Sequence, residues 1–223
     1  MTRLNPSVLA IAVVSLVAPM LLANRAQATL LVTNGSFEDS ANFVSPGNDT
    51  MSLAVGSTTM PGWTVAGSES LAWIGSSNPY GLSASAGSYF LDLTGYSIGA
   101  PFSGVTQTIA TSSGSTYQLS FDLGSSSLYG IPSAITASAA AASQTFTSTL
   151  TGTNSWETET LLFTATGATT AISLLGAAGS NYIGLDNVSV AFVSGPGIVP
   201  EPAALSLMAV GLFGLGVARR RRA

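Results

Sequence analysis

Residues 116–123 read Thr-Tyr-Gln-Leu-Ser-Phe-Asp-Leu, with polar and apolar side chains in strict alternation. Successive side chains of an extended chain point to opposite faces, so one face of this segment is entirely apolar. That face carries Tyr117, Leu119, Phe121 and Leu123. The period of two predicts a β-strand with one buried face and one polar face.

Similar short segments recur along the chain, separated by clusters of Gly, Ser, Asn and Pro. An apolar stretch at 29–33 precedes a turn at Asn34-Gly35, and 39–58 and 75–87 are expected to be loops. The alanine run at 139–142 is compatible with a helix, but its Ser, Thr and β-branched neighbours favour strands. This pattern predicts an all-β sandwich or barrel. The expected strands are 63–65, 70–74, 88–93, 104–109, 116–123, two within 135–151, 156–165, 169–175 and 183–192.

The body of the chain carries only acidic charge. All six basic residues lie in the first 25 or the last five positions, and the chain contains neither histidine nor cysteine. Residues 29–199 hold nine acidic residues and no basic one, which gives a net charge of −9. Such a surface repels nucleic acid, and the missing residue types exclude a Ser-His-Asp triad, thiol catalysis and thiolate or imidazole metal sites. Each buried carboxylate then needs hydrogen-bond donors or a metal ion.

The last 25 residues fall into three parts. Val199-Pro200-Glu201-Pro202 comes first, an uncharged apolar run follows at 203–218, and Arg219-Arg220-Arg221-Arg222-Ala223 ends the chain. A helix of this apolar run would span about 24 Å, a little less than the ~30 Å hydrocarbon core, and flanking arginines can snorkel. Because positive charge stays in the cytoplasm, the arginines predict that the rest of the chain lies across the membrane.

This tail resembles the PEP-CTERM sorting signal of Gram-negative bacteria. The resemblance implies recognition by an exosortase-type membrane protease and cleavage near Pro-Glu-Pro. The protein would be held transiently in the inner membrane and then released to the cell surface or the extracellular matrix, in bacteria that make exopolysaccharide. A plain C-terminal anchor is the simpler alternative.

The N-terminus also predicts export. Arg3 supplies positive charge, an apolar core occupies 8–23, and the small residues at 26 and 28 fit the signal-peptidase rule. We expect cleavage between Ala28 and Thr29. The alternative, a first membrane span, is disfavoured because polar residues and a proline interrupt the run. The expected organisation is a signal peptide at 1–28, a sandwich domain at 29–193, a linker at 194–198 and the sorting signal at 199–223.

Several short motifs are spread over the predicted domain. They are Asn-Gly-Ser-Phe-Glu at 34–38, Pro-Gly-Trp at 61–63, Gln107, the segment 114–122, and Leu-Asp-Asn-Val-Ser-Val at 185–190. In this order and spacing they resemble the galactose-binding-like jelly rolls. That group includes carbohydrate-binding modules and a plant cell-wall family whose members begin Asn-Gly-x-Phe-Glu. The resemblance covers nearly all of 31–192 and implies a jelly-roll β-sandwich.

A structural calcium ion is one implication of the resemblance. Because the first and last strands of such a fold lie close together, Glu38 and Asp186 are expected to approach each other. Two carboxylates without a nearby cation repel, and Ca²⁺ is a hard cation that takes six to eight oxygen ligands. The alternative is that Glu38 is solvated and Asp186 caps a turn.

Aromatic residues are the candidates for ligand binding, because an aromatic ring packs well on the apolar face of a sugar. Trp73 and Tyr80 flank the loop at 75–87 and are the preferred candidates. Trp156 is a further candidate, whereas Trp63, within its Pro-Gly-Trp motif, is expected to be in the core.

Three functions remain open from the sequence. The first is a non-catalytic carbohydrate-binding or exopolysaccharide-associated module on the cell surface or in the matrix. The second is a structural biofilm or coat protein without a small ligand. The third is a carboxylate-dependent glycosidase, for which Glu157 and Glu159 share a strand face but no motif marks an acid and nucleophile pair.

Overall fold

The computed structural model describes residues 31–95 and 97–196. These residues form eleven strands in two antiparallel sheets. The predicted signal peptide with its cleavage site, the sorting motif, the apolar run and the arginine cluster lie outside the described residues. Within residues 31–95 and 97–196, no helix has the length and apolar character needed to cross a bilayer.

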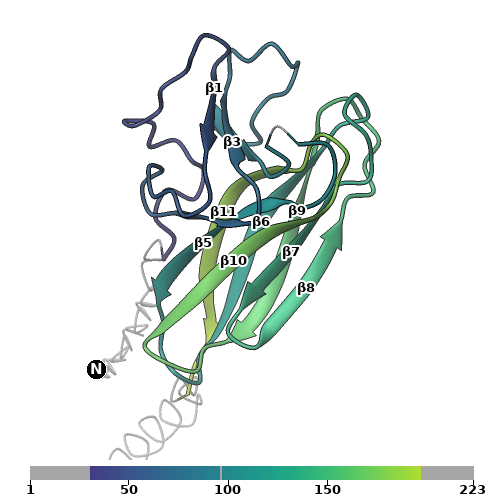
Figure 1. Cartoon of the computed structure of the whole chain (residues 1–223). Coiled ribbons are helices and arrows are strands. Elements are labelled where there is room, and N and C mark those ends of the chain that lie inside the picture. The colour runs from purple at the N-terminus through teal and green to yellow at the C-terminus, as the bar shows by residue number, and fades with distance from the viewer. Residues whose placement is uncertain (1–30, 96, 197–223) are drawn as a thin grey trace, which may run out of the picture.

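The two sheets pack face to face as a sandwich (Figure 1). The larger sheet has the order β1-β3-β4-β11-β6-β9, and the smaller has the order β2-β5-β10-β7-β8. The strands of the larger sheet are β1 (Thr50–Leu53), β3 (Leu71–Gly75), β4 (Tyr89–Asp92), β6 (Thr116–Ser125), β9 (Ser155–Thr164) and β11 (Gly184–Ser194). Those of the smaller sheet are β2 (Thr64–Gly67), β5 (Ser103–Ala110), β7 (Ala134–Ala139), β8 (Ala142–Thr147) and β10 (Thr169–Ala178).

The last eight strands have jelly-roll connectivity. Four of them form the order β4-β11-β6-β9 and the other four form β5-β10-β7-β8, so the chain crosses repeatedly between the sheets. Two four-stranded antiparallel sheets joined in this way define a jelly roll. The three remaining strands, β1, β2 and β3, extend the edges of the two sheets. The predicted fold class is therefore confirmed for the described residues.

The main core lies between the sheets and is built from the alternating faces that the sequence predicts. On β6 the inward side chains Tyr117, Leu119, Phe121 and Leu123 are all at most 5% exposed. Fully burying a large apolar side chain contributes about 1.5–3 kcal/mol, so this one strand makes a substantial contribution to stability. The alanine run lies at the turn between β7 and β8, where Ala140 has a left-handed φ of 52°. The interpretation of this segment as two strands is confirmed.

The N-terminal part differs from the prediction in two places. The apolar stretch that precedes the turn at Asn34-Gly35 is not part of either sheet, and β1 lies within a segment that was expected to be a loop. Gln107 accounts for the first difference, because its side-chain amide accepts from the Thr33 N–H (2.7 Å) and donates to the Thr33 carbonyl (2.9 Å). A side chain thus supplies the pairing that a neighbouring strand would otherwise provide.

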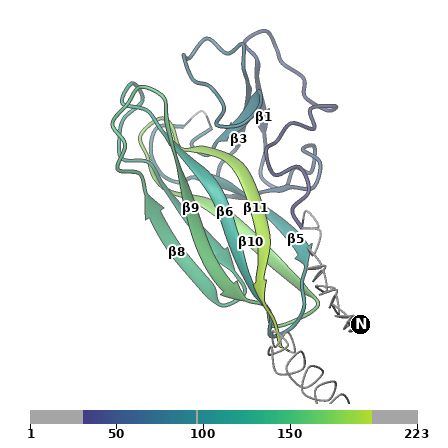
Figure 2. The same ribbon diagram turned by 180° about the vertical axis from the view of Figure 1, so that it is seen from behind.

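The two ends of the sandwich have different surroundings. In both views β1 and β3, with the loops around them, lie at one end, and β11 finishes at the other (Figures 1 and 2). The last described residues therefore leave the sandwich at the end opposite β1 and β3. This arrangement matters because the candidate site lies beside β1 and β3.

Candidate functional site

The candidate site lies on the outer face of the larger sheet. A second, smaller apolar cluster covers part of this face, and segment 76–88, which joins β3 to β4, crosses it towards β9. The crossing is fixed by hydrogen bonds from Trp156 Nε1 to the Ser83 carbonyl (3.0 Å) and from the Ser85 hydroxyl to Asp122 (2.6 Å). The cluster beneath consists of Ala72, Ile74, Leu82, Phe90 and Tyr182, flanked by Tyr80, Ala84, Tyr129 and Trp156.

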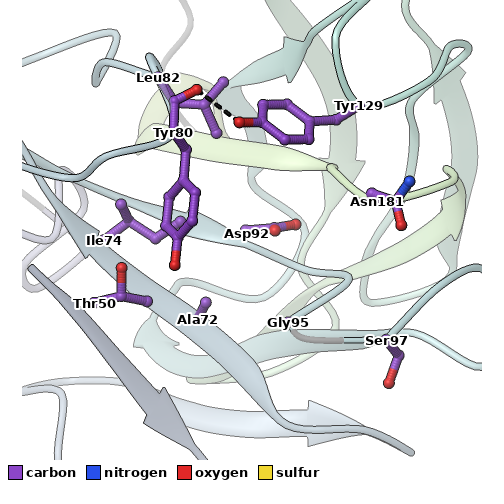
Figure 3. A pocket seen from close by; sticks show the side chains of 10 residues that line it. All are labelled: Thr50, Ala72, Ile74, Tyr80, Leu82, Asp92, Gly95, Ser97, Tyr129 and Asn181. Carbon is purple, nitrogen blue, oxygen red and sulfur yellow. Dashed lines mark hydrogen bonds between the residues drawn. The ribbon is translucent and has the colours of Figure 1, made fainter. Parts of the chain in front are cut away.

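A pocket of about 290 Å³ opens over β1, β3 and β4 beside this segment (Figure 3). Its floor is formed by outward-facing residues of these three strands. Its walls come from segment 76–88, from Gly95 and Ser97, and from the loops around residues 129 and 181. Figure 3 shows Asp92 between Tyr80 and Asn181, with Tyr129 nearby. The lining residues are Thr50, Ala72, Ile74, Tyr80, Leu82, Asp92, Gly95, Ser97, Tyr129 and Asn181.

Asp92, at the end of β4, is the charged group of the pocket. It is only 5% exposed. Its Oδ1 accepts hydrogen bonds from the Thr94 N–H (3.0 Å), the Thr94 hydroxyl (2.9 Å) and the Ile183 N–H (3.0 Å). Burial raises the pKa of this carboxyl group from about 3.8 to about 7, although the three donors act in the opposite direction. Asp92 is therefore a positioned carboxylate whose charge is only partly compensated.

Two tyrosines are held in place around Asp92. The Tyr129 hydroxyl donates to the Tyr80 carbonyl (2.7 Å), and the Tyr80 hydroxyl accepts from the Asn48 side chain (3.1 Å). Asn181 approaches from the opposite side, and its N–H donates to the Tyr129 carbonyl (3.0 Å). Tyr80 was predicted to bind ligand, and it does line the pocket, whereas ligand binding itself stays a prediction.

Two exposed apolar residues are sequence neighbours of residues that line the pocket. Ile98 follows the lining residue Ser97 and is 83% exposed, and Leu128 precedes Tyr129 and is 62% exposed. The loop at 180–181 joins their two loops, because the Gly99 N–H donates to the Ser180 carbonyl (2.7 Å) and the Asn181 N–H donates to the Tyr129 carbonyl (3.0 Å).

Trp73 was expected to stack on a ligand, and the structure corrects this expectation. Its side chain is on the inward face of β3 and is 0% exposed, in edge contact with Phe43 at a ring-centroid distance of 5.1 Å. Trp63 is in the core as predicted, at 2% exposed. Trp156 is half-buried in the small outer cluster. The period of two along β3 places residue 73 on the same face as the core residue Leu71.

Glu38 and Asp186 both accept hydrogen bonds from the segment that joins β3 to β4. Glu38 Oε1 accepts from the N–H groups of Ser88 (2.8 Å) and Tyr89 (2.7 Å), while Asp186 Oδ2 accepts from the Ala86 N–H (2.9 Å). Within residues 31–95 and 97–196 no group of three or more acidic side chains is arranged to hold a metal. Backbone donors thus already occupy one oxygen of each carboxylate. Calcium binding stays a prediction that a melting curve with and without the ion can test.

Asp186 and Asp122 lie directly opposite each other on β11 and β6. Burial raises the pKa of Asp186 to about 7, and the charge of Asp122 acts in the same direction. A register shift beyond Asp186 leaves Asn187 with a φ of 50°, so its side chain can donate to Asp122 (3.2 Å). Asp122 also accepts from the Thr158 hydroxyl (2.6 Å). These hydrogen bonds compensate the carboxylates in a domain without cationic side chains.

The short motifs that resemble the galactose-binding-like jelly rolls contact one another in the folded domain, and none of their residues lines the pocket. The Val188 N–H donates to the Gly35 carbonyl (2.8 Å), so the first motif contacts the last. Trp63 Nε1 donates to the Asn34 carbonyl (2.9 Å), which joins the Pro-Gly-Trp motif to the same place. A Cβ atom on Gly35 would collide with the Val188 carbonyl oxygen, so this close approach requires glycine. The motifs therefore identify the fold and not the ligand.

The sequence analysis did not find the pocket residues Asp92, Tyr129 and Asn181. Asp92 lies at the end of a strand that was predicted from its apolar residues alone. A single aspartate also forms no recognisable sequence motif. The only available signal was that a domain without basic residues must compensate each buried carboxylate in another way. Which carboxylate would lie in a pocket depends on three loops that are distant in sequence.

These features define an all-β domain of the jelly-roll class with a small, loop-walled pocket that holds one buried carboxylate. The chain belongs to the family described as "Protein of unknown function (DUF642)", whose model matches residues 30–184. A second family model, the PEP-CTERM protein-sorting motif, matches residues 199–222. The predicted sorting signal is therefore confirmed, and it indicates export and exosortase-mediated sorting to the surface or the extracellular space. A search among curated proteins finds no match.

Solved structures with a similar chain course include carbohydrate-binding modules. TmCBM61, in complex with β-1,4-galactotriose, is 15% identical, with a TM-score of 0.48 over 74% of this chain and 100% of that one. The CBM22-1 xylan-binding domain from Paenibacillus barcinonensis Xyn10C is 14% identical, with a TM-score of 0.43 over 65% and 93%. Arabinose-bound MgGH51 α-L-arabinofuranosidase is 19% identical, with a TM-score of 0.46 over 74% and 26%. The fold assignment does not depend on these matches, because the strand order establishes it.

Proposed function

We propose that this protein is an exported, non-catalytic carbohydrate-binding module of the cell surface or the extracellular matrix. The observation that carries the proposal is the pocket, in which two tyrosines, a buried carboxylate and an exposed amide surround about 290 Å³. Aromatic rings pack against the apolar faces of sugars, and carboxylate and amide groups accept from or donate to hydroxyls. The volume is close to the lower end of the ~300–1,000 Å³ typical of ligand pockets, which suits one sugar residue of a longer chain.

The position of the pocket supports a role at the surface. The pocket lies beside β1 and β3, and the chain leaves the sandwich towards its sorting motif at the other end (Figures 1 and 2). A protein held by its C-terminal segment would therefore present the pocket away from the membrane. We propose a Gram-negative host, transient anchoring in the inner membrane through 203–218, and removal of the tail by an exosortase-type protease.

Binding is tested by calorimetry of the full-length protein against neutral, amino and acidic polysaccharides and their oligomers. We expect saturable binding to at least one of them, and we expect Tyr80→Ala to weaken it at least tenfold. Phe192→Ala is the matched control, because Phe192 is an exposed aromatic residue (47%) near the opposite end, on β11. Failure of every polysaccharide to bind, together with concentration-dependent assembly, would favour the structural biofilm or coat protein instead.

A glycosidase is the less favoured alternative. Glycoside hydrolysis uses a pair of carboxylic acids, and Asp92 is the single carboxylate among the described residues that line the pocket. Glu157 and Glu159 are on β9, where Glu157 accepts from the Thr149 N–H (3.0 Å). Release of reducing ends from a bound polysaccharide, and its loss in Asp92→Asn, would overturn the non-catalytic proposal.

A further inference from the structure

The lone carboxylate of the pocket has unused hydrogen-bonding capacity. All three described donors to Asp92 act on Oδ1, and no described residue donates to Oδ2. Asp92 is 5% exposed and lines the cavity, so Oδ2 is the acceptor that remains for a bound molecule. A buried carboxylate loses its hydration, and that loss is compensated best by a charge-assisted hydrogen bond.

No positive partner is available from the domain itself. Residues 29–199 contain no lysine, arginine or histidine. Asp92 and Asp186 both raise the pKa of the Tyr182 hydroxyl further beyond the effect of burial, so negative charge gathers around this buried tyrosine. Anionic ligands would be repelled by Asp92 and by the net charge of −9, whereas a cationic ligand would be attracted. A cationic ligand would therefore supply a counter-charge that the domain itself does not provide.

The remaining lining residues suit a cation on a sugar ring. Tyr80 and Tyr129 line the same cavity as Asp92, and an aromatic face attracts an ammonium group within about 6 Å. The hydroxyls of Thr50 and Ser97 and the Asn181 amide supply further polar groups that could contact hydroxyls of the ring. Ile98 and Leu128, the exposed neighbours of the lining residues Ser97 and Tyr129, would be available to the next residues of a polysaccharide.

We propose that the pocket recognises a sugar residue bearing a free, protonated amine, with its ammonium group on Asp92 Oδ2 and its ring between Tyr80 and Tyr129. This inference rests on the proposed function, since it names the ligand class of the same pocket. De-N-acetylated amino sugars in a polysaccharide meet the requirement. Neutral sugars lack the charge, N-acetyl sugars lack both the charge and the small size, and uronic acids have the wrong charge.

The test uses three β-1,4-linked glucose tetramers that differ only at carbon 2, which carries a hydroxyl, an N-acetyl group or a free amine. Binding to the full-length protein is measured by calorimetry at pH 7. We expect the amino tetramer to bind on the order of tenfold more tightly than the other two, with one site per protein. Equal affinity for the amino and hydroxyl tetramers would overturn the inference and leave the carbohydrate-binding function intact.

Two variants separate a specific contact from diffuse attraction to an acidic protein. Asp92→Asn keeps the acceptor oxygen for Thr94 and Ile183 but removes the charge, so we expect the preference for the amine to disappear. Asp39→Asn removes one charge from an exposed residue outside the pocket lining and should leave the preference unchanged. Equal losses in both variants would show diffuse attraction only and would overturn the proposal.

Each remaining outcome is also decisive. Failure of all three tetramers to bind the wild-type protein contradicts the inference, while the wider polysaccharide panel separately decides the proposed function. If Asp92→Asn does not fold, as a thermal melt would reveal, the preference of the wild-type protein for amine over N-acetyl still tests the proposal. Saturating the protein with the amino tetramer should also quench the fluorescence of Trp156, which packs in the cluster beneath the pocket. We expect this quenching to be weaker in Tyr80→Ala than in the wild type.

Discussion

At the residue scale, Asp92 is an acidic residue that is buried without a cationic partner. This combination is unusual, because a buried charge normally needs such a partner. Its three donors fix the geometry of Oδ1, and burial nevertheless raises its pKa to about 7. Asp186, on the neighbouring strand β11, has its pKa raised to about 7 for the same main reason. The domain therefore holds two acidic groups that take up protons close to neutral pH.

We predict that the protein is more stable near pH 5 than near pH 8. Between about pH 4 and pH 7, folded Asp92 and Asp186 hold protons that the unfolded chain has released, so raising the pH favours unfolding. The free energy of unfolding should fall by about 1.4 kcal/mol per pH unit for each group at most, and by a few kcal/mol in total. Urea denaturation at both pH values measures this difference.

Asp92→Asn isolates one of the two groups. Its free energy of unfolding should depend less steeply on pH, and at pH 8 the variant should be more stable than the wild type. Asp39→Asn, which changes an exposed carboxylate, should keep the steep dependence of the wild type. A wild-type protein that is equally stable at pH 5 and pH 8 would refute the burial argument.

At the element scale, the N-terminal segment is attached to the sandwich mainly by side chains. Gln107 on β5 pairs with both backbone groups of Thr33, and Trp63 donates to Asn34. These contacts replace a strand pairing, which explains why residues 31–38 are ordered without belonging to a sheet.

We therefore predict that Gln107→Ala lowers the free energy of unfolding by about 2–3 kcal/mol, because two hydrogen bonds are lost and the groups of Thr33 lose their partners. Limited proteolysis should then cut the chain near residues 31–38 before the sandwich is degraded. Gln144→Ala on β8 is the matched control, since that side chain is exposed, and its stability should remain within ~0.5 kcal/mol of the wild type. Equal effects of the two substitutions would contradict this role of Gln107.

The edge strand β9 of the larger sheet carries charged residues that protect it against pairing with a second molecule. β9 pairs with β6 alone, and Glu157 and Glu159 are paired with Leu123 and Phe121, on the inward side of the strand. Burial and the neighbouring charge of Glu157 raise the pKa of Glu159. Inward-pointing charges on an edge strand prevent it from pairing with a second molecule.

Replacing both glutamates by threonine should therefore cause association. We predict that Glu157→Thr/Glu159→Thr forms dimers and larger species as concentration rises, as measured by light scattering. A second double variant, Asp39→Asn/Glu69→Gln, removes the same amount of charge elsewhere and should remain like the wild type. Association of both variants would instead indicate an effect of net charge.

The same scale shows what the sequence could predict. Strands with an alternating pattern, such as 116–123, were predicted almost to the residue, because a sandwich buries one face of each strand. β1 was not, because Thr50–Leu53 has only four residues and owes its order to pairing with β3. The pocket depends on loops around residues 80, 97, 129 and 181. No local pattern brings these loops together, so Tyr80 could be proposed from its place in a loop, whereas Asp92 could not.

At the scale of the whole molecule, the direction of the chain connects the pocket with the sorting motif. The domain ends opposite β1 and β3, and the sorting motif follows at 199–222 (Figures 1 and 2). Under the proposed transient anchoring, the four arginines at 219–222 would keep this end in the cytoplasm until processing. The pocket should therefore be on the far side of the membrane and at the distal end of the domain.

Labelling of single cysteines can test this orientation, because the natural chain contains no cysteine. We predict that Ile98→Cys, next to the lining residue Ser97, reacts with a membrane-impermeant maleimide on intact cells or in the medium, since residue 98 is 83% exposed. Ala72→Cys is the control, because it places a small side chain where the native residue is only 1% exposed, and it should react far more slowly. Trp73→Cys would be unsuitable, because it would open the core. Mass spectrometry of the labelled product should find a chain that begins at Thr29 and lacks the arginines. Labelling of Ile98→Cys only after the cells are broken would contradict export, since a domain retained in the cytoplasm could not meet an extracellular polysaccharide. A mature product that keeps residues 219–222 would contradict the processing.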